Sequence, residues 1–268
     1  MSHFAFAKTP TQADKLLETR AKSKPRMEQL SGVGELAILP PQVTDNTQGS
    51  TEMNNMEQAR FNMLEQQIRP WNVLDTNVLD LLAKVKREQF VPPAMQEMAF
   101  MDMEIPLGHG ASMWYPKLEA RALQALKIGR GDRVLEVGSG SGYLTALMSH
   151  LAQHVTSVEV VPELHAFAEK NLAAHRIDNV TLALGDAAQG WPGEYDGIVL
   201  TGSVPVLPET LQNSLKPGGR LFAIVGDAPL MQARLITRIS HGVFESVTLF
   251  ETSVAPLQNT QQPKRFVF

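Results

Sequence analysis

The stretch Val134-Leu-Glu-Val-Gly-Ser-Gly-Ser-Gly-Tyr-Leu-Thr145 decides the fold of this 268-residue chain. Its apolar first half is typical of a buried strand, and three glycines then alternate with serines. Apolar residues recur at helical spacing from Leu144 to Leu151. The pattern therefore predicts a strand, a tight turn and a helix, with main-chain amides at the helix start facing a ligand.

The spacing of the glycines indicates which ligand. Glycine adopts positive φ and lets a ligand approach the backbone. Dinucleotide enzymes use G-x-G-x-x-G, whereas this turn reads G-x-G-x-G and follows an acid. That arrangement favours S-adenosylmethionine, which lacks a pyrophosphate and carries an ammonium and a sulfonium that a carboxylate attracts. A plain strand-to-helix turn is the alternative for the glycines alone. The predicted cofactor contacts here are Glu136, Gly138, Ser139, Gly140 and Gly142.

Two acids further along the chain support a nucleoside site. Val155–Val160 reads as a β-branched strand in which Glu159 lies about twenty residues past the glycines, where a carboxylate can accept both ribose hydroxyls. The next predicted strand, Val180–Leu184, is followed by Asp186 and Ala187, which we expect at the adenine amine. Each acid alone is also compatible with a solvated loop, but both follow successive strands.

These motifs, with Asp196-Gly-Ile-Val-Leu200 and Leu215-Lys-Pro-Gly-Gly219, resemble the class I S-adenosylmethionine-dependent methyltransferases. The resemblance implies an α/β fold, a doubly wound Rossmann-like sheet that is mostly parallel, with helices on both faces. Gln232–Ile239 and Phe244–Thr252, separated by Gly242, predict an antiparallel pair at the edge of this sheet.

Composition limits the remaining possibilities. A net charge of −4 and a pI near 6.0, without a long basic run, argue against nucleic acid or an anionic membrane as the main partner. The absence of cysteine excludes disulfides, thiolate catalysis and cysteine zinc sites. The seven histidines lack metal-ligand spacing, so no metal site is predicted. No apolar stretch reaches the roughly 18 residues of a membrane span. We expect a soluble, cytoplasmic protein, and the sequence leaves its oligomeric state open.

The ends of the chain differ from its middle. Residues 1–55 are largely polar and predict a mobile extension, in which Leu36–Pro40 is a short apolar piece that can dock. A downstream translation start at Met53 or Met56 is an open alternative. The predicted organisation is an extension at 1–55, a helical cap and acceptor loop at 56–115, a cofactor-binding core at 116–257 and a mobile tail at 258–268.

The region before the core indicates which family of methyltransferases the chain resembles. A helical pattern from Met56 stops at Arg69-Pro70, and Asp75 predicts the cap of a second helix. Arg87-Glu-Gln-Phe-Val-Pro92 and Pro106-Leu-Gly-His-Gly110 follow, and the chain from about 56 to 257 resembles the protein-L-isoaspartate O-methyltransferases. The resemblance implies a protein-repair enzyme that methylates the carboxylate of isomerised aspartyl residues in a protein or peptide substrate, with S-adenosylmethionine as cofactor.

One loop departs from that family. The family pattern P-x-G-x-G-x-T-x-S-x-P is matched here with Ser112 in place of threonine and Trp114 in place of the key serine, and Tyr115 replaces a usual glutamine. The family serine lies beside the transferred methyl group, whereas an indole offers one donor nitrogen on an apolar plate. Three explanations are open: Ser112 takes over the catalytic role, Trp114 stacks on a different acceptor, or activity is lost and cofactor binding is kept.

The predicted chemistry depends on positioning. A carboxylate acceptor is ionised at neutral pH and needs no general base, so proximity and alignment dominate. His109 is then a candidate for contacting the acceptor, and Thr201 and Ser203 follow another strand and are candidates for lining the same cleft. Backbone hydrogen bonding and turn capping are the alternatives for these three side chains. Two rival functions are a noncatalytic adenosyl-ligand binder, suggested by Trp114, and a nicotinamide oxidoreductase, suggested by the generic glycine turn.

Overall fold

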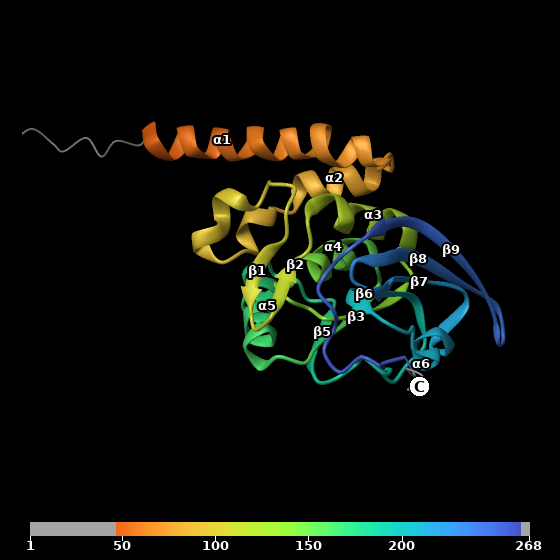
Figure 1. The fold of residues 1–268 in the computed structure, drawn as a ribbon. Helices are drawn as coiled ribbons and strands as arrows, with labels where there is room; N and C mark the ends of the chain where they lie inside the picture. Colours follow the sequence, from red (N-terminus) through yellow and green to blue (C-terminus); the bar gives the residue numbers. More distant parts are fainter. Residues whose placement is uncertain (1–46, 264–268) are drawn as a thin grey trace, which may run out of the picture. The chain divides into compact units, whose positions relative to one another are not determined.

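A computed structural model of the chain describes residues 47–263 (Figure 1). The predictions for the first 46 residues, including Leu36–Pro40, and for the last five fall outside this range. The helical elements, in chain order, are α1 (Thr47–Met63), η2 (Leu64–Ile68), η3 (Arg69–Trp71), α2 (Thr76–Lys84), η4 (Arg87–Gln89), η5 (Pro93–Met98), α3 (Pro116–Leu126), α4 (Tyr143–Leu151), α5 (Pro162–Ala174) and α6 (Glu209–Asn213). The strands are β1 (Ile105–Gly108), β2 (Ala111–Met113), β3 (Arg133–Val137), β4 (His154–Glu159), β5 (Val180–Leu184), β6 (Tyr195–Val204), β7 (Leu215–Asp227), β8 (Leu230–Ser240) and β9 (Val243–Thr252).

Seven of these strands form one sheet in the order β5-β4-β3-β6-β7-β8-β9. The first five run parallel, and β8 and β9 are antiparallel, so the predicted mostly parallel sheet with an antiparallel edge is confirmed. The order reverses at β3, because Val134 pairs with Val155 of β4 on one side and Gly197 of β6 on the other. Ligands of such sheets bind outside the carboxyl ends of the strands at this reversal.

Alternation along the strands divides the core between the two sheet faces. Val134 and Phe222 belong to one apolar cluster, with residues of α2, α3 and α4, whereas Leu135 and Leu221 belong to a second cluster. The second cluster contains Leu211 of the five-residue helix α6. Helices therefore cover both faces, as predicted for a doubly wound sheet, although the cover is much heavier on one face.

The helical cap packs on the core without lining the cofactor cleft. Helix α1 begins at Thr47, inside the stretch expected to be a mobile extension and nine residues before the predicted start at Met56. The Asp75 side chain accepts a hydrogen bond from the Asn77 amide at 2.9 Å, which confirms the predicted cap of α2. Cap and core form one compact unit, and neither α1 nor α2 lines the two cavities described below.

A buried ion pair attaches α1 to η4 within the helical cap. Arg60 lies 6% exposed and bonds to Glu88, which is 5% exposed. The Arg60 guanidinium also lies over the Phe100 ring, 5.5 Å from its centroid. Since removing one partner of such a pair leaves a buried charge uncompensated, the pair fixes α1 against η4.

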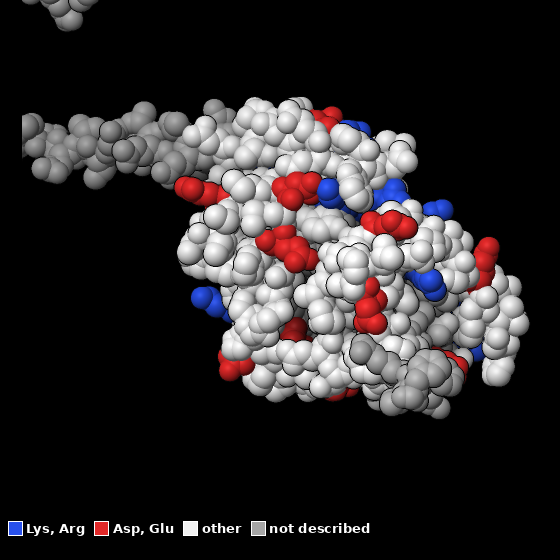
Figure 2. All heavy atoms as spheres, viewed as in Figure 1, with Lys and Arg blue, Asp and Glu red and all other residues white. Residues whose placement is uncertain are grey.

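The surface of the described residues agrees with the moderate net charge. Acidic and basic side chains are scattered over the face shown in Figure 2, without a continuous basic patch on that face. Within residues 47–263, no helix has the length and apolar character needed to cross a membrane.

Candidate active site

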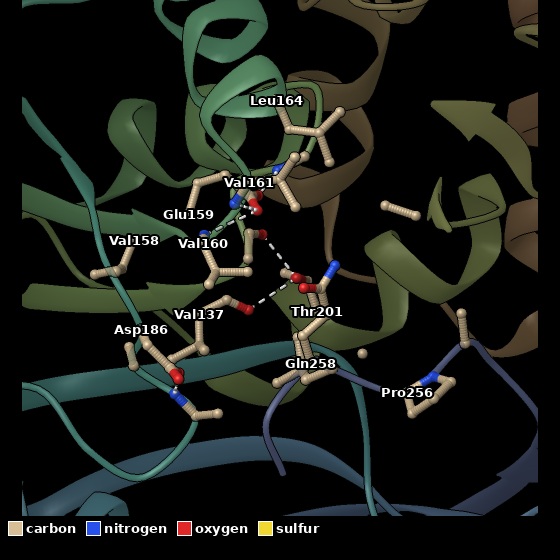
Figure 3. A pocket seen from close by; sticks show the side chains of 18 of the residues that line it. Val137, Val158, Glu159, Val160, Val161, Leu164, Asp186, Thr201, Pro256 and Gln258 are labelled. Atoms are coloured by element: carbon tan, nitrogen blue, oxygen red, sulfur yellow. Dashed lines mark hydrogen bonds between the residues drawn. The ribbon is translucent and has the colours of Figure 1, made fainter. Parts of the chain in front are cut away.

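An open cavity of about 700 Å³ lies at the reversal of strand order. Its lining comes from the carboxyl ends of β3, β4 and β6, the segment after β5, and the loop that contains Ser112. Residues 255–258 form a further wall that the sequence did not suggest. Figure 3 shows Glu159, Asp186 and Thr201 around this cavity, each supplied by a different part of the sheet.

Glu159 ends β4 and lines this cavity, as predicted for a ribose ligand. Its Oε2 accepts a hydrogen bond from the Gly140 amide at 2.9 Å, and its Oε1 accepts from the Val160 and Val161 amides at 3.0 and 3.1 Å. Three backbone amides therefore donate hydrogen bonds to this carboxylate, and only 4% of the residue is exposed. A carboxylate has about four acceptor positions, so one remains for a ligand hydroxyl in this arrangement.

Asp186 and Ala187 follow β5 and line the same cavity. Asp186 Oδ1 accepts from the Ala188 amide at 2.9 Å, and Oδ2 accepts from the Asn259 side chain at 2.8 Å. The sequence placed Asn259 in a mobile tail, whereas the structure describes the tail through Pro263 and bonds Asn259 into the site. No periodic pattern links residues 73 positions apart, so this contact had no local signal.

The glycine turn after β3 forms as predicted, but its members differ in role. Gly138 and Gly140 line the cavity, and a Cβ on Gly138 would lie 2.3 Å from Thr201 Oγ1. Gly142 lines neither this cavity nor the smaller one beside it; a Cβ there would meet Ala168 of α5 at 3.3 Å. The expectation that Gly142 contacts the cofactor therefore gains no support, whereas its φ of +79° and its close approach to Ala168 fit a packing role between α4 and α5.

Thr201 holds the turn in place. Its hydroxyl lies 2.8 Å from the Val137 carbonyl oxygen and 2.7 Å from that of Gly138, and it donates between them (Figure 3). Thr201 lines the cavity, as predicted for the cleft. Ser203 is different: it is 1% exposed, and its hydroxyl donates to the Val254 carbonyl at 3.3 Å. The prediction that Ser203 lines the cleft is not met, because it faces the segment that follows β9.

A second cavity of about 320 Å³ adjoins the first and lies beneath the acceptor loop. Both cavities are lined by Ser112, Gly138, Gly140 and Thr201. The smaller one also contains Glu136, which has no exposed surface. The smaller cavity is therefore the one beside the buried acid that precedes the glycine turn.

One carboxylate oxygen of Glu136 accepts hydrogen bonds, and the other has no hydrogen-bond partner. Oε2 accepts from the Ser157 hydroxyl at 2.6 Å and from the Thr145 hydroxyl, whereas Oε1 is buried without a partner. Ser139, predicted as a cofactor contact, bonds through its hydroxyl to Ser157 at 2.5 Å and lines only the smaller cavity. Burial raises the pKa of Glu136 to about 8. An unpaired buried carboxylate oxygen is a vacant position for a donor such as an ammonium group, so the residues fit the cofactor implied by the fold.

The acceptor loop is the β1–β2 hairpin and its exit. Ser112 lies in β2, half-buried, and lines both cavities. Trp114 is only 4% exposed; its indole packs edge-on against Phe222 with ring centroids 6.1 Å apart and closes one side of the smaller cavity. Tyr115 points elsewhere, because its hydroxyl bonds to the Thr252 side chain on β9.

His109 lies at the exposed tip of this hairpin with a φ of +54°. It does not line either cavity, and its Nδ1 lies 4.0 Å from Glu163 Oε2 on α5. The prediction that His109 contacts the acceptor has no support in this arrangement. The positive φ and the flanking glycines reflect the tight turn.

Arg87, which the sequence offered only as part of a motif, fixes the end of the acceptor loop. It is 1% exposed, and its Nε donates to the Ala99 carbonyl at 2.8 Å. One Nη donates to Glu119 of α3 and the other to the Trp114 carbonyl. The guanidinium also lies 5.1 Å from the ring centroid of Tyr143, the first residue of α4. A single side chain thus ties the loop to the helix that follows the glycine turn.

Among residues 47–263, no three His, Cys, Asp or Glu side chains gather in a way that would hold a metal ion. The site consists of an open cavity, the carboxylates of Glu159 and Asp186 at or just after the ends of two adjacent strands, and a buried acid beside the glycine turn. At the reversal point of a parallel sheet, this combination defines a class I S-adenosylmethionine-dependent methyltransferase.

Comparison with known proteins shows to which family of methyltransferases the chain belongs. The family model described as "Protein-L-isoaspartate(D-aspartate) O-methyltransferase (PCMT)" matches residues 55–262. The chain belongs to this family of S-adenosylmethionine-dependent enzymes. Protein-L-isoaspartate O-methyltransferase 1 of Rhodopseudomonas palustris is 36% identical over 211 residues, which cover 78% of this chain and 86% of that protein. The Anaeromyxobacter dehalogenans enzyme is 40% identical over 189 residues, which cover 69% of this chain and 90% of that protein.

A solved structure supports the fold. A putative protein-L-isoaspartate O-methyltransferase from Plasmodium falciparum, in complex with S-adenosyl-L-homocysteine, superposes with a TM-score of 0.65 at 22% identity. The match covers 76% of this chain and 99% of that one. The resemblance drawn from the sequence motifs is thereby confirmed at the level of family and fold.

Proposed function

We propose that the protein transfers the methyl group of S-adenosylmethionine to the carboxylate of isomerised aspartyl residues in proteins or peptides. The relatives carry this activity in their names. The observation that supports it most directly is the junction of the two cavities at Ser112 and Thr201. A nucleoside in the larger cavity is thereby connected to the chamber beneath the acceptor loop.

The residues divide between the parts of the cofactor. Glu159 accepts from a ribose hydroxyl through its remaining acceptor position, and Asp186 with the Ala187 amide binds the adenine edge, since these residues line the larger cavity. Glu136, whose Oε1 lacks a partner, accepts from the ammonium group in the smaller cavity. Gly138 and Gly140 let the backbone approach where the two cavities meet.

The chain's part in the reaction is positioning. S-adenosylmethionine supplies a methyl group already activated on a sulfonium, and an acceptor carboxylate is ionised at neutral pH. Ser112 donates its hydroxyl hydrogen to the acceptor carboxylate, because it is the hydroxyl of the acceptor loop that lines both cavities. Trp114 and Leu144 close the apolar side of the smaller cavity and exclude water from it.

Among the three explanations for Trp114, its burial favours retained activity. A stacking plate for another acceptor needs an exposed ring face, whereas this indole is 4% exposed and packs on Phe222. The lost serine hydroxyl is then compensated by Ser112 on the same hairpin.

The test compares an isoaspartyl peptide with its normal aspartyl twin in a methyl-transfer assay. We expect methylation of the isoaspartyl peptide alone. Ser112→Ala should lower kcat/KM about ten-fold or more, equivalent to about 1.4 kcal/mol of barrier, with S-adenosylhomocysteine affinity within a factor of about two. Ser246→Ala, an exposed serine on β9, is the matched control.

Cofactor binding without methylation of either peptide would contradict the proposal, because it would leave a noncatalytic binder. An equal rate on both peptides would show that the acceptor is another group. A Ser112→Ala enzyme with full activity would show that Ser112 does not hold the acceptor. A Trp114→Ser variant that gains isoaspartyl activity would show instead that the indole, and not Ser112, limits the native rate.

A further inference from the structure

The segment Val254–Asn259, which follows β9, forms a strap along the carboxyl end of β6. The Ser203 amide donates to the Ala255 carbonyl at 3.0 Å, and the Leu257 amide donates to the Ser203 carbonyl at 3.0 Å. Pro256 and Gln258 of this strap line the larger cavity (Figure 3). The strap is therefore a wall of the nucleoside site.

Asn259, at the end of the strap, forms hydrogen bonds with two residues of the segment that follows β5, Asp186 and Gln189. Its side-chain amide donates to Asp186 Oδ2 at 2.8 Å, and its backbone carbonyl accepts from the Gln189 side chain at 3.1 Å. Its φ is +57°, a left-handed conformation that asparagine tolerates better than most residues. The strap thus bends at this residue so that its amide meets the acid.

Asp186 is consequently held by two donors from different parts of the chain. The Ala188 amide fixes Oδ1 at 2.9 Å and Asn259 fixes Oδ2 at 2.8 Å. A carboxylate held in this way cannot turn away from a ligand, and each of its oxygens still has a free acceptor position. A fixed acceptor favours an amino group and repels a carbonyl oxygen at the same place.

We propose that Asn259 is a positioning residue for purine recognition: by holding Asp186, it makes the site select a 6-aminopurine over a 6-oxopurine. The inference rests on the proposed function only in assigning the larger cavity to the adenosyl group. Without Asn259, only the Ala188 amide still holds the Asp186 carboxylate, so the carboxylate turns more easily, binds an amino group less well and avoids an oxo group more easily. Affinity and selectivity should therefore fall together.

The test measures the dissociation constants of S-adenosylhomocysteine and S-inosylhomocysteine by calorimetry for wild type and two variants. Asn259→Gly keeps the left-handed backbone and removes the amide, and Asn259→Asp keeps the shape but replaces the donor with a second carboxylate. We expect S-adenosylhomocysteine to bind at least five-fold more weakly to both variants, and the preference over S-inosylhomocysteine to shrink at least three-fold. Asn259 is exposed, so both variants should fold; Gln261→Ala, an exposed tail residue, is the control.

The two ligands separate positioning from a merely structural role. Equal weakening of both ligands, with the preference intact, would overturn the inference, because it would mean that Asn259 only supports the wall. Unchanged constants in both variants would also overturn it. If the wild type binds neither ligand, the assignment of the cavity and the proposed function fail, and the inference falls with them.

Discussion

Replacing Glu136 with glutamine should change how cofactor binding depends on pH. Glu136 is fully buried, its Oε1 lacks a partner, and burial raises its pKa to about 8. The ionisable groups near it are Glu159 on β4 and Glu119 on α3; Glu119 is paired with Arg87, and burial raises its pKa to about 8 as well. In the empty protein below pH 8, Glu136 is therefore mostly neutral. To pair with the ligand's ammonium group it must lose its proton.

The size of the effect follows from this proton release. Release of one proton gives at most a ten-fold gain in affinity per pH unit, or about 30-fold between pH 6 and pH 7.5. Glu136→Gln can neither ionise nor pair with the ammonium group, so its affinity should be nearly flat over that range. At pH 7.5 it should bind about 10 to 100 times more weakly, since a hydrogen bond to a charged group contributes about 1.5 to 3 kcal/mol. The two curves should converge toward acid pH.

Calorimetry with S-adenosylhomocysteine, in buffers of different ionisation enthalpy, counts the protons directly. Wild type should release close to one proton per ligand at pH 6.5, and Glu136→Gln close to none. Glu119→Gln is the control, because it lies in the same cavity and should leave the release intact. Wild type that releases no proton, or a glutamine variant that releases as many, would refute the reasoning.

Three further predictions concern stability and binding. Glu159→Ala should weaken cofactor binding by about 2 to 4 kcal/mol, and an affinity within two-fold of wild type would contradict the ribose assignment. Because its carboxylate accepts from three backbone amides, the same variant should also lower the free energy of unfolding by about 1 to 3 kcal/mol. Arg87→Lys keeps a charge beside Glu119 but loses the hydrogen bonds to the Ala99 and Trp114 carbonyls. The free energy of unfolding, measured with denaturant, should therefore fall by about 2 kcal/mol or more. An unchanged unfolding midpoint would mean that these hydrogen bonds contribute little to stability. A chain that starts at Met53 retains the Arg60–Glu88 pair and should keep its melting temperature and cofactor affinity, whereas a large drop in either would show that the preceding residues contribute.

Much of the fold could be predicted because its signals are local. The β-branched runs before Glu159 and Gly185 predict strands by composition, and the alternating glycines after Val137 predict the turn. The doubly wound, mostly parallel arrangement of the strands came from family resemblance. Local patterns located Glu159 and Asp186 at or just after strand ends, and the structure brings both residues to one cavity.

The missed features depend on partners far along the chain. Asn259 bonds to Asp186, 73 residues away, and Arg87 bonds to Glu119, 32 residues away. Gly142 lies so close to Ala168 that a Cβ there would be 3.3 Å from it, and this contact is not visible in the local sequence. Helix α1 was predicted to start late, because its first turns are polar and its buried apolar residue is Met63. Such contacts become visible only when the sheet brings distant segments together.

The position of the strap in the chain has a consequence for biosynthesis. Val254–Asn259 follows every strand of the sheet, so among the segments that form the nucleoside cavity it leaves the ribosome last. A nascent chain that ends after β9 has all seven strands but lacks the wall and the amide that holds Asp186. Since a ligand stabilises a state in proportion to how well that state binds it, S-adenosylmethionine stabilises the growing sheet less than the finished domain. Its full stabilising effect is reached only after synthesis has passed Asn259.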